Sequence, residues 1–340
     1  MKDYWRSEQM AGKWTAEKIM EITGGYQGAC VLFAAADLDI FSILDKAPMT
    51  AQALAAKIGA DTRATTILLD ALSAMGLLVK DDAKYSTGPA VAELLTERAT
   101  GNILGMVRHR ANCLGRWVQL AEVVKRGKPA ERQPSIRGAG ADQAAFIEAM
   151  HNFSEPAAAQ IVGEMGPLNF RHLLDIGGAS GTWTIAFLRA VGDARATLFD
   201  LPEVIPMARQ RIAEAGLGER VTFVGGDFYA DDLPAEADFA WLGAICHQNS
   251  RRQNRRLFAK IYAALNKGGA IVLRDVVMDP TRTKPEGGAM FAINMVVATE
   301  GGGTYTFEEY QSDLADAGFG DVTLLKRDEF MNSLIRAAKL

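Results

Sequence analysis

The stretch HLLDIGGASGTWTIAFLRA, from His172 to Ala190, predicts a buried strand, a tight glycine turn and a helix. Leu173, Leu174 and Ile176 form a short apolar run, interrupted near its end by Asp175, that is typical of a parallel strand covered on both faces. Gly177, Gly178 and Gly181 then crowd the turn, and glycine has no Cβ atom to keep a ligand from the backbone. In open α/β sheets ligands bind at the carboxyl ends of the strands, so this turn is a candidate binding site.

The order of residues in this turn differs from the usual dinucleotide fingerprint. Counted from Asp175 it reads D-x-G-x-A-x-G, with an acid first and Ala179 in the middle. A carboxylate there would repel a pyrophosphate, which prefers bare amides at a helix N-terminus. S-adenosylmethionine has a sulfonium, an ammonium and a ribose but no phosphate, so we predict that Asp175 belongs to a site for this cofactor. The alternative is a glycine-rich turn that binds nothing.

Length and composition set limits on the protein class. A chain of 340 residues suits two domains, and 49% hydrophobic with 23% charged residues is enough for a sizeable core. The net charge of −4 argues against a general nucleic-acid binder. The N-terminus has no signal-peptide core, and the longest apolar run, Ala29–Ala36, is too short to span a membrane. We therefore predict neither a nucleic-acid nor a membrane partner.

The chain has three cysteines, Cys30, Cys113 and Cys246, which are far apart in the sequence. They show no spacing typical of disulfides or of a zinc site, so no metal is predicted. Their small number fits a reducing compartment, and the prediction is a cytoplasmic protein.

The first part of the chain has the order helix, turn, helix, hairpin, which is that of a winged helix. Thr50 is placed to cap one helix that ends at Gly59, and Asp61 or Thr62 to cap a second that stops at Gly76. A β-hairpin is expected from residues 77 to 87. The second helix is mostly apolar, which favours a protein partner such as a second copy of the chain over DNA.

After a helical region from about residue 102 to 166, strand-like and helical segments alternate. Such alternation predicts a parallel, doubly wound sheet. Asp175, Asp200 and Asp227 fall at the ends of the first three strands, so all three are expected at one edge of the sheet. The acid after the second strand suits ribose hydroxyls. Asp227, followed by Phe228, suits an adenine, since the ring can stack and the carboxylate can accept the exocyclic amine.

The fourth strand of this domain leads to His247, a candidate general base at the same edge. The alternative is a polar residue with a purely structural role. Asp275 ends the fifth strand and is placed to hold the imidazole in one tautomer, whereas the adjacent Arg274 could pair with a carboxylate.

Five motifs resemble those of class I S-adenosylmethionine-dependent O-methyltransferases, in the plant-type and bacterial small-molecule family whose members dimerise through a winged-helix domain. They are DIGGASG at Asp175, FDLPEV at Phe199, GDFY at Gly226, AICHQN at Ala244 and LNKGG at Leu265. The resemblance implies a Rossmann-like, mostly parallel seven-stranded sheet preceded by a mainly α winged-helix dimerisation domain. It implies a dimerisation domain over residues 1–100, a helical connector over 101–164 and a catalytic domain over 165–340.

The resemblance also implies roles for single residues and a homodimer. His247 would be the base and Asp275 the acid beside it. The cofactor residues by matching position are Gly177, Gly181, Asp200, Leu201, Asp227 and Phe228.

The chain departs from the family pattern at three places. Gln248-Asn249 follow the histidine where the family commonly has an acid and Trp, and Gly243 replaces a frequent lysine. Gly301-Gly302-Gly303-Thr304 replaces a Gly-Gly-Lys-Glu segment, with Glu300 as a possible substitute for its glutamate.

The predicted reaction is O-methylation of a hydroxylated aromatic or polyketide-like small molecule. Phe146 and Met150 have the i, i+4 spacing of one helix face and are either core or acceptor contacts. The predicted acceptor pocket consists of Phe146, Met150, Met290, Phe291, Asn294 and Met295. The alternatives are a relative with C- or N-methylating or non-methylating chemistry, and a DNA-binding regulator.

Overall fold

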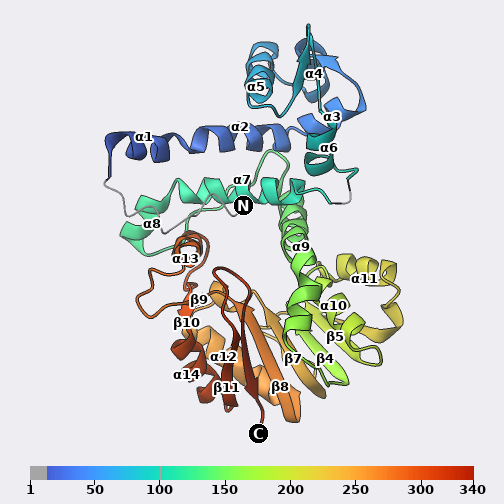
Figure 1. The fold of residues 1–340 in the computed structure, drawn as a ribbon, viewed down its shortest axis with the longest axis vertical. Helices are drawn as coiled ribbons and strands as arrows, with labels where there is room; N and C mark the ends of the chain where they lie inside the picture. Colours follow the sequence, from blue (N-terminus) through green and yellow to red (C-terminus); the bar gives the residue numbers. More distant parts are fainter. Residues whose placement is uncertain (1–13, 100) are drawn as a thin grey trace. The chain divides into compact units, whose positions relative to one another are not determined.

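The computed structural model describes residues 14–99 and 101–340, which form two compact units (Figure 1). One unit contains residues 14–99 and 101–115 together with Gln133–Asn152, and the other contains Arg116–Arg132 and Phe153–Leu340. No single helix of the described residues is long and apolar enough to cross a membrane, although the bent pair Ala16–Asp37 and Ile40–Lys46 reaches that length and composition together.

The first unit is mainly helical and has a small three-stranded sheet of order β1-β3-β2. Its elements are α1 (Ala16–Gly24), α2 (Tyr26–Asp37), α3 (Ile40–Lys46), β1 (Met49–Thr50), α4 (Ala51–Ile58), α5 (Thr62–Ala74), β2 (Val79–Asp81), β3 (Lys84–Ser86), α6 (Pro89–Leu95), most of α7 (Leu104–Trp117) and the first part of α9 (Ala139–Glu164). As predicted, Thr50 accepts a hydrogen bond from the Ala53 amide at 3.2 Å and Asp61 one from the Ala64 amide at 2.8 Å. The helix–turn–helix–hairpin order is thereby confirmed.

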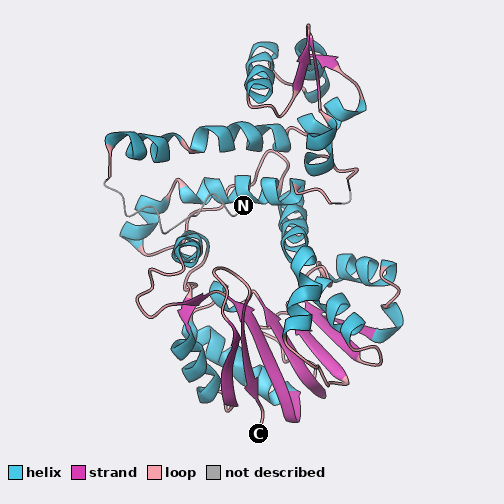
Figure 2. Ribbon diagram, viewed as in Figure 1, coloured by secondary structure: helices cyan, strands magenta, loops and turns pink. Residues whose placement is uncertain are grey.

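The second unit is built on a seven-stranded sheet of order β11-β12-β8-β7-β4-β5-β6 (Figure 2). The five strands from β4 to β8 run parallel, whereas β12 is antiparallel to β8 and β11 to β12. The strands are β4 (His172–Ile176), β5 (Arg195–Asp200), β6 (Val221–Gly225), β7 (Ala237–Gly243), β8 (Leu265–Asp275), β11 (Gly320–Lys326) and β12 (Ser333–Ala338), with β9 (Val277–Met278) and β10 (Tyr305–Thr306) forming a small parallel pair. The predicted mostly parallel, doubly wound sheet is confirmed.

Helices cover both faces of this sheet. One core joins the sheet to the second half of α9, to α10 (Thr182–Ala190) and to α11 (Ile205–Glu214). The other joins it to α12 (Arg251–Ala264) and α14 (Phe307–Asp316). The remaining elements are α8 (Leu120–Arg126), α13 (Glu286–Ala298) and the 3₁₀ turns η1 (Gly218–Arg220) and η2 (Cys246–Gln248). Because both faces are covered, only the strand ends and their loops are left for a binding site.

The glycine turn between β4 and α10 leaves no room for larger residues. Gly177 and Gly181 have φ angles of +69° and +77°, in the left-handed region that glycine adopts without strain. At Gly178 the constraint is space, because a Cβ atom would lie 2.6 Å from Cγ of the buried Leu198. The turn is therefore pressed against β5, the neighbouring strand.

We expect the substitution Gly178→Ala to destabilise the protein by about 1–3 kcal/mol, the usual cost of inserting a methyl group into a packed core. Urea denaturation followed by circular dichroism measures this change. The control is Gly163→Ala in α9, where a Cβ meets no atom within 4 Å and helix propensity predicts a gain of up to about 1 kcal/mol. Equal stability of the Gly178→Ala protein and the wild type would contradict the packing argument.

Candidate active site

Asp175 lies near the carboxyl end of the central strand β4, one residue before this strand ends. Its carboxyl group is buried and accepts a hydrogen bond of 2.6 Å from the Thr184 hydroxyl in the first turn of α10. Burial raises the pKa of Asp175 to about 7, partly opposed by this hydrogen bond. Asp175 thus fixes the start of α10 under the glycine turn, and its predicted contact with a cofactor stays a prediction.

Asp200, the last residue of β5, joins the second turn to the first. One carboxylate oxygen accepts the Ala179 amide and the other the Leu201 amide, each at 2.7 Å. Burial is the main cause that raises the pKa of Asp200. The bond from Ala179, whose φ is +46°, holds the glycine turn in a conformation that non-glycine residues rarely adopt.

The third turn follows β6 and contains Asp227 and Phe228. Asp227 accepts a hydrogen bond from the Tyr229 amide at 2.8 Å, so the carboxylate folds the turn on itself. Lys260 of α12 donates to three backbone carbonyls of this turn, those of residues 228, 229 and 231, at 3.0, 3.2 and 2.8 Å. A Cβ at Gly177 would lie 3.9 Å from the Phe228 ring, so the first and third turns meet at the sheet edge.

His247 lies in η2, after β7, and both its backbone and its ring are bonded to Asp275 at the end of β8. The His247 amide donates to Asp275 Oδ2 at 3.1 Å, and Nδ1 lies 2.9 Å from Asp275 Oδ1. A carboxylate only accepts, so Nδ1 carries the proton and the lone pair is on Nε2. Asp275 is 2% exposed and His247 9% exposed, which shields this pair from water.

The predicted acceptor residues of α13 lie in the same unit as His247. The Phe291 ring meets the His247 ring edge to face, with 4.8 Å between the ring centres. The Asn294 carboxamide accepts a hydrogen bond of 2.9 Å from the Trp117 indole. Met290 is exposed and Met295 is buried.

Phe146 and Met150 lie on the part of α9 that belongs to the first unit. There Phe146 packs against the ring of His109, with 5.1 Å between ring centres. The acceptor-binding role of all six residues stays a prediction.

Comparison with known proteins identifies the family. A model of the O-methyltransferase domain matches residues 117–320, and a model of the O-methyltransferase dimerisation domain matches residues 20–98. The chain belongs to the O-methyltransferase family. The tetracenomycin polyketide synthesis 8-O-methyltransferase TcmO of Streptomyces glaucescens is 32% identical over 310 residues, 89% of this chain and 91% of the relative.

Two further proteins support the same assignment. The 3-hydroxy-5-methyl-1-naphthoate 3-O-methyltransferase of Streptomyces sahachiroi is 29% identical, over 91% of this chain and 90% of its own length. The crystal structure of human N-acetylserotonin methyltransferase with S-adenosylmethionine has a TM-score of 0.78 and 25% identity, covering 96% of this chain and 99% of that chain. The predicted family, fold class, enzyme class and cofactor, S-adenosylmethionine, are thereby confirmed.

The glycine segment of this methyltransferase that departs from the family pattern packs directly against the backbone of His247. The Gly303 amide donates to the His247 carbonyl at 2.8 Å. A Cβ at Gly302 would lie 2.5 Å from that carbonyl oxygen, so no larger residue fits. Glu300 is exposed. Among the described residues, Asp275 is the carboxylate bonded to the His247 ring.

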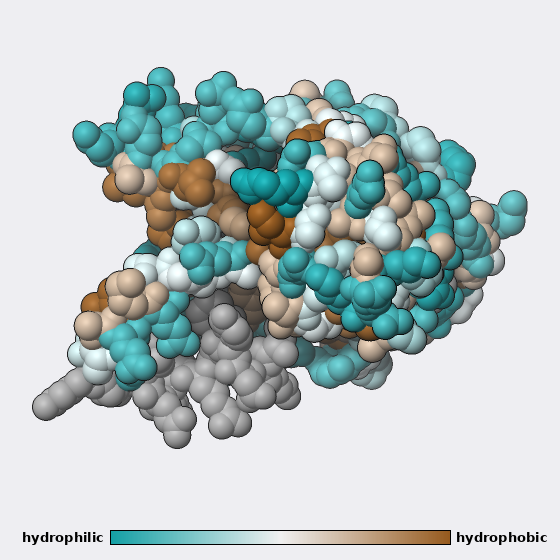
Figure 3. Space-filling model, turned by 90° about the horizontal axis from the view of Figure 1, so that it is seen from above, coloured by the Kyte–Doolittle hydropathy of each residue, from teal (hydrophilic) through white to brown (hydrophobic). Residues whose placement is uncertain are grey.

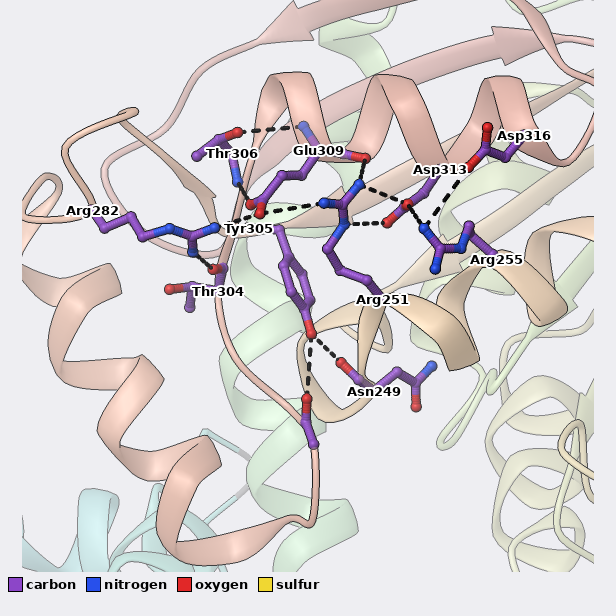
Figure 4. Close-up of polar contacts among 11 residues, drawn as sticks. Asn249, Arg251, Arg255, Arg282, Thr304, Tyr305, Thr306, Glu309, Asp313 and Asp316 are labelled. Carbon is purple, nitrogen blue, oxygen red and sulfur yellow. Dashed lines mark hydrogen bonds and ion pairs between the residues drawn. The ribbon is translucent and has the colours of Figure 1, made fainter. Parts of the chain in front are cut away.

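Asn249 is a structural centre of the His247 loop that sequence reasoning did not identify. Its side chain is fully buried, accepts the Tyr229 hydroxyl at Oδ1 and donates to Asn254 at 2.9 Å. Asn254 donates in turn to the Cys246 carbonyl at 3.0 Å, and Tyr305 donates to the Asn249 carbonyl (Figure 4). The signal available in the sequence was the departure itself, since a polar residue at a position where the family commonly has Trp requires new partners.

An ion-pair network fixes the next residues of the loop to α14. Arg251 donates to both carboxylate oxygens of Asp313, at 2.9 and 2.8 Å (Figure 4). Glu309 caps α14 by accepting the Thr306 amide at 2.9 Å and also pairs with Arg282. The loop that positions His247 is therefore held on both sides.

The substitution Asp175→Asn tests the buried carboxyl group. The folded pKa of about 7 exceeds the unfolded value of about 3.9, so the carboxyl favours folding at low pH and this contribution is lost as the pH rises to about 7. Asn cannot ionise. We expect the free energy of unfolding of the wild type, relative to Asp175→Asn, to fall by about 1.4 kcal/mol per pH unit between pH 4 and 7 and then to level off.

Urea denaturation at pH 5, 6, 7 and 8 measures the difference. The exposed Asp193, substituted by Asn, is the matched control and should show no such trend. A wild-type advantage that is constant over this range would show that the Asp175 carboxyl does not titrate there.

Proposed function

We propose that this methyltransferase transfers the methyl group of S-adenosylmethionine to a hydroxyl of an aromatic or polyketide-like small molecule, with His247 as general base. The observation that carries the proposal is the hydrogen bond of 2.9 Å between His247 Nδ1 and the buried Asp275, which leaves Nε2 as a base. The adjacent Phe291 ring suits an aromatic acceptor. TcmO and the naphthoate methyltransferase both act as O-methyltransferases.

The residues at the sheet edge fit the cofactor. None of the three turns, residues 177–183, 200–205 and 226–232, contains Lys or Arg, and the carboxylates of Asp200 and Asp227 would repel a phosphate. Each oxygen of Asp200 accepts one backbone amide and has a lone pair left for a ribose hydroxyl. We infer that Asp200, Leu201, Asp227 and Phe228 hold the adenosyl group, with Gly177 and Gly181 admitting it close to the backbone and Asp175 behind the turn.

The bound cofactor supplies an electrophilic methyl group. The protein has to align the acceptor oxygen with it and to remove the proton of that oxygen. A phenol has a pKa of about 10, so at neutral pH the proton must leave as the new bond forms. His247 Nε2 takes that proton, and Asp275 stabilises the imidazolium that results. Phe291 and the other pocket residues predicted on α13 exclude water and orient the acceptor ring.

We expect His247→Ala to lower kcat by about 10²–10⁴-fold, the usual contribution of a general base, because the phenol proton then has no acceptor. Asp275→Asn should lower kcat by a smaller factor, since the imidazole is kept but its tautomer is no longer enforced. The assay is transfer of labelled methyl from the cofactor to a panel of phenols. The control is the affinity for S-adenosylhomocysteine, which should not change in either variant.

A decrease of less than about tenfold in His247→Ala would remove this residue from the role of base. Label found on carbon or nitrogen of the acceptor, rather than on oxygen, would favour the alternative chemistries.

We infer that the protein forms a homodimer through the first unit and acts in the cytoplasm. Ile19, Ile22 and Tyr26 follow one another at i, i+3 and i+7 spacing across α1 and α2, and they are 50%, 63% and 58% exposed. A row of large apolar side chains on a helix surface favours a protein partner. Apolar residues also reach the surface among polar ones on the face drawn in Figure 3. A second copy of the chain fits the match to the dimerisation domain.

We expect Ile22→Glu to shift the protein from dimer to monomer, since a charge in an apolar interface loses its water without gaining a partner. Sedimentation velocity at several concentrations measures the change. Thr23→Glu adds the same charge at the next exposed position of α1 and should leave the dimer intact. A monomeric wild type, or equal dissociation of the two variants, would contradict the assignment of this face.

A further inference from the structure

Arg274 is a buried cation next to the catalytic pair. It precedes Asp275 at the end of β8 and is 2% exposed. Its Nε donates to the Asn332 carboxamide at 2.9 Å, and Nη2 is buried without a hydrogen-bond partner among the described residues. Burial lowers the pKa of Arg274 to about 10, so the guanidinium is still charged at neutral pH.

The carboxylates of Asp275 and Asp328 raise the pKa of Arg274 through their charge, but both accept hydrogen bonds from other groups. Asp275 accepts the His247 ring and amide as well as the Val276 amide at 2.8 Å. Asp328 accepts the Phe330 and Asn332 amides at 3.0 and 3.2 Å. Neither lies within 4.0 Å of the guanidinium in an ion pair, among the residues that the structure describes. A buried charge without a close counterion is costly, so this one calls for an anion that binds there.

Aromatic rings connect Arg274 to His247 within the second unit. The guanidinium carbon lies 4.6 Å from the centre of the Trp183 ring and 5.7 Å from that of Phe153. From Phe153 the rings follow one another edge to face, with centres 6.2 Å apart to Phe330, then 5.6 Å to Phe291, and 4.8 Å from there to His247. The base and the cation thus lie at opposite ends of one aromatic cluster.

We propose that Arg274 binds a carboxylate of the acceptor, and that the acceptor is a hydroxylated aromatic acid. This inference rests on the proposed function. The ring of this acceptor lies among the phenylalanines between His247 and Arg274. Its hydroxyl lies at the base and its carboxylate at the guanidinium. Arginine presents paired donors that match a carboxylate, and in a water-excluded site such a charge-assisted bond is strong. A lysine or a neutral residue would not select the acid in the same way.

The carboxylate of the cofactor's amino-acid tail has the same chemistry as that of an aromatic acid. It is the rival source of the anion, because Trp183, which Arg274 contacts, belongs to α10, the helix after the glycine turn. The ring cluster that leads from Arg274 to His247 favours the acceptor. The two sources give different results in a binding experiment.

The test compares 6-hydroxy-2-naphthoate with 2-naphthol and with methyl 6-hydroxy-2-naphthoate. All three share the ring and a hydroxyl, and only the first has a carboxylate. They are titrated by calorimetry into the protein saturated with S-adenosylhomocysteine. We expect the wild type to bind the acid at least about tenfold more tightly than either neutral compound. Arg274→Met, which keeps an apolar side chain, should abolish this preference, and Arg274→Lys should retain part of it.

The matched control is Arg336→Met, which removes an exposed arginine from the neighbouring strand β12 and should preserve the preference. Equal binding of acid and neutral compounds by the wild type, or no binding of the acid, overturns the inference, and this comparison needs no variant. A preference that persists in Arg274→Met also overturns it. Weaker binding of S-adenosylhomocysteine by Arg274→Met, without any acid preference in the wild type, assigns the residue to the cofactor instead and overturns the acceptor assignment.

Failure of the proposed function and failure of the carboxylate site give different results in a methylation assay. If the acid binds through Arg274 but its hydroxyl receives no methyl group, the carboxylate site stands and the proposed reaction fails. If the acid and 2-naphthol are methylated with equal kcat/KM, the reaction stands and the carboxylate site fails.

Discussion

The hydrogen bonds between His247 and the buried Asp275 are the interaction on which the candidate active site depends. A histidine four residues beyond the end of β7 lies on a short 3₁₀ turn, which by itself does not fix the ring. Asp275 holds both the amide and Nδ1, so the position of the proposed base is set by the neighbouring strand. Strand pairing between β7 and β8 thereby becomes part of the geometry of the candidate site, since Gly243 pairs with Arg274 one residue before that acid.

Much of the fold could be predicted from the sequence because its signals are local. The caps at Thr50 and Asp61 and the apolar run of β4 each depend on a few adjacent residues. The acids that end β5 and β8 could be placed at one edge, since parallel strands share the direction of their carboxyl ends. Asp227 lies two residues beyond β6, which is still the same edge.

The interactions that fix the His247 loop could not be predicted, because they join residues far apart in the chain. Asn249 bonds to Tyr229 and Tyr305, and Gly303 to His247, and no spacing in the sequence brings these partners together. Gly243, at the position where the family frequently has a lysine, has a local steric explanation. A Cβ at Gly243 would lie 2.7 Å from the Trp241 indole nitrogen, so the tryptophan takes the space that a larger side chain would need.

These departures from the family pattern are physically linked. Where relatives commonly have an acid and Trp after the histidine, this chain has a buried amide that needs polar partners, and Tyr229 and Asn254 provide them. Tyr229 also belongs to the turn with Asp227, the predicted adenine contact, so this turn and the His247 loop share one hydrogen bond. The glycines at 301–303 then let the following segment approach the His247 carbonyl. In this chain the Gly303 amide and the buried Asn249 therefore hold the His247 loop together, without the acid and Trp of the family pattern.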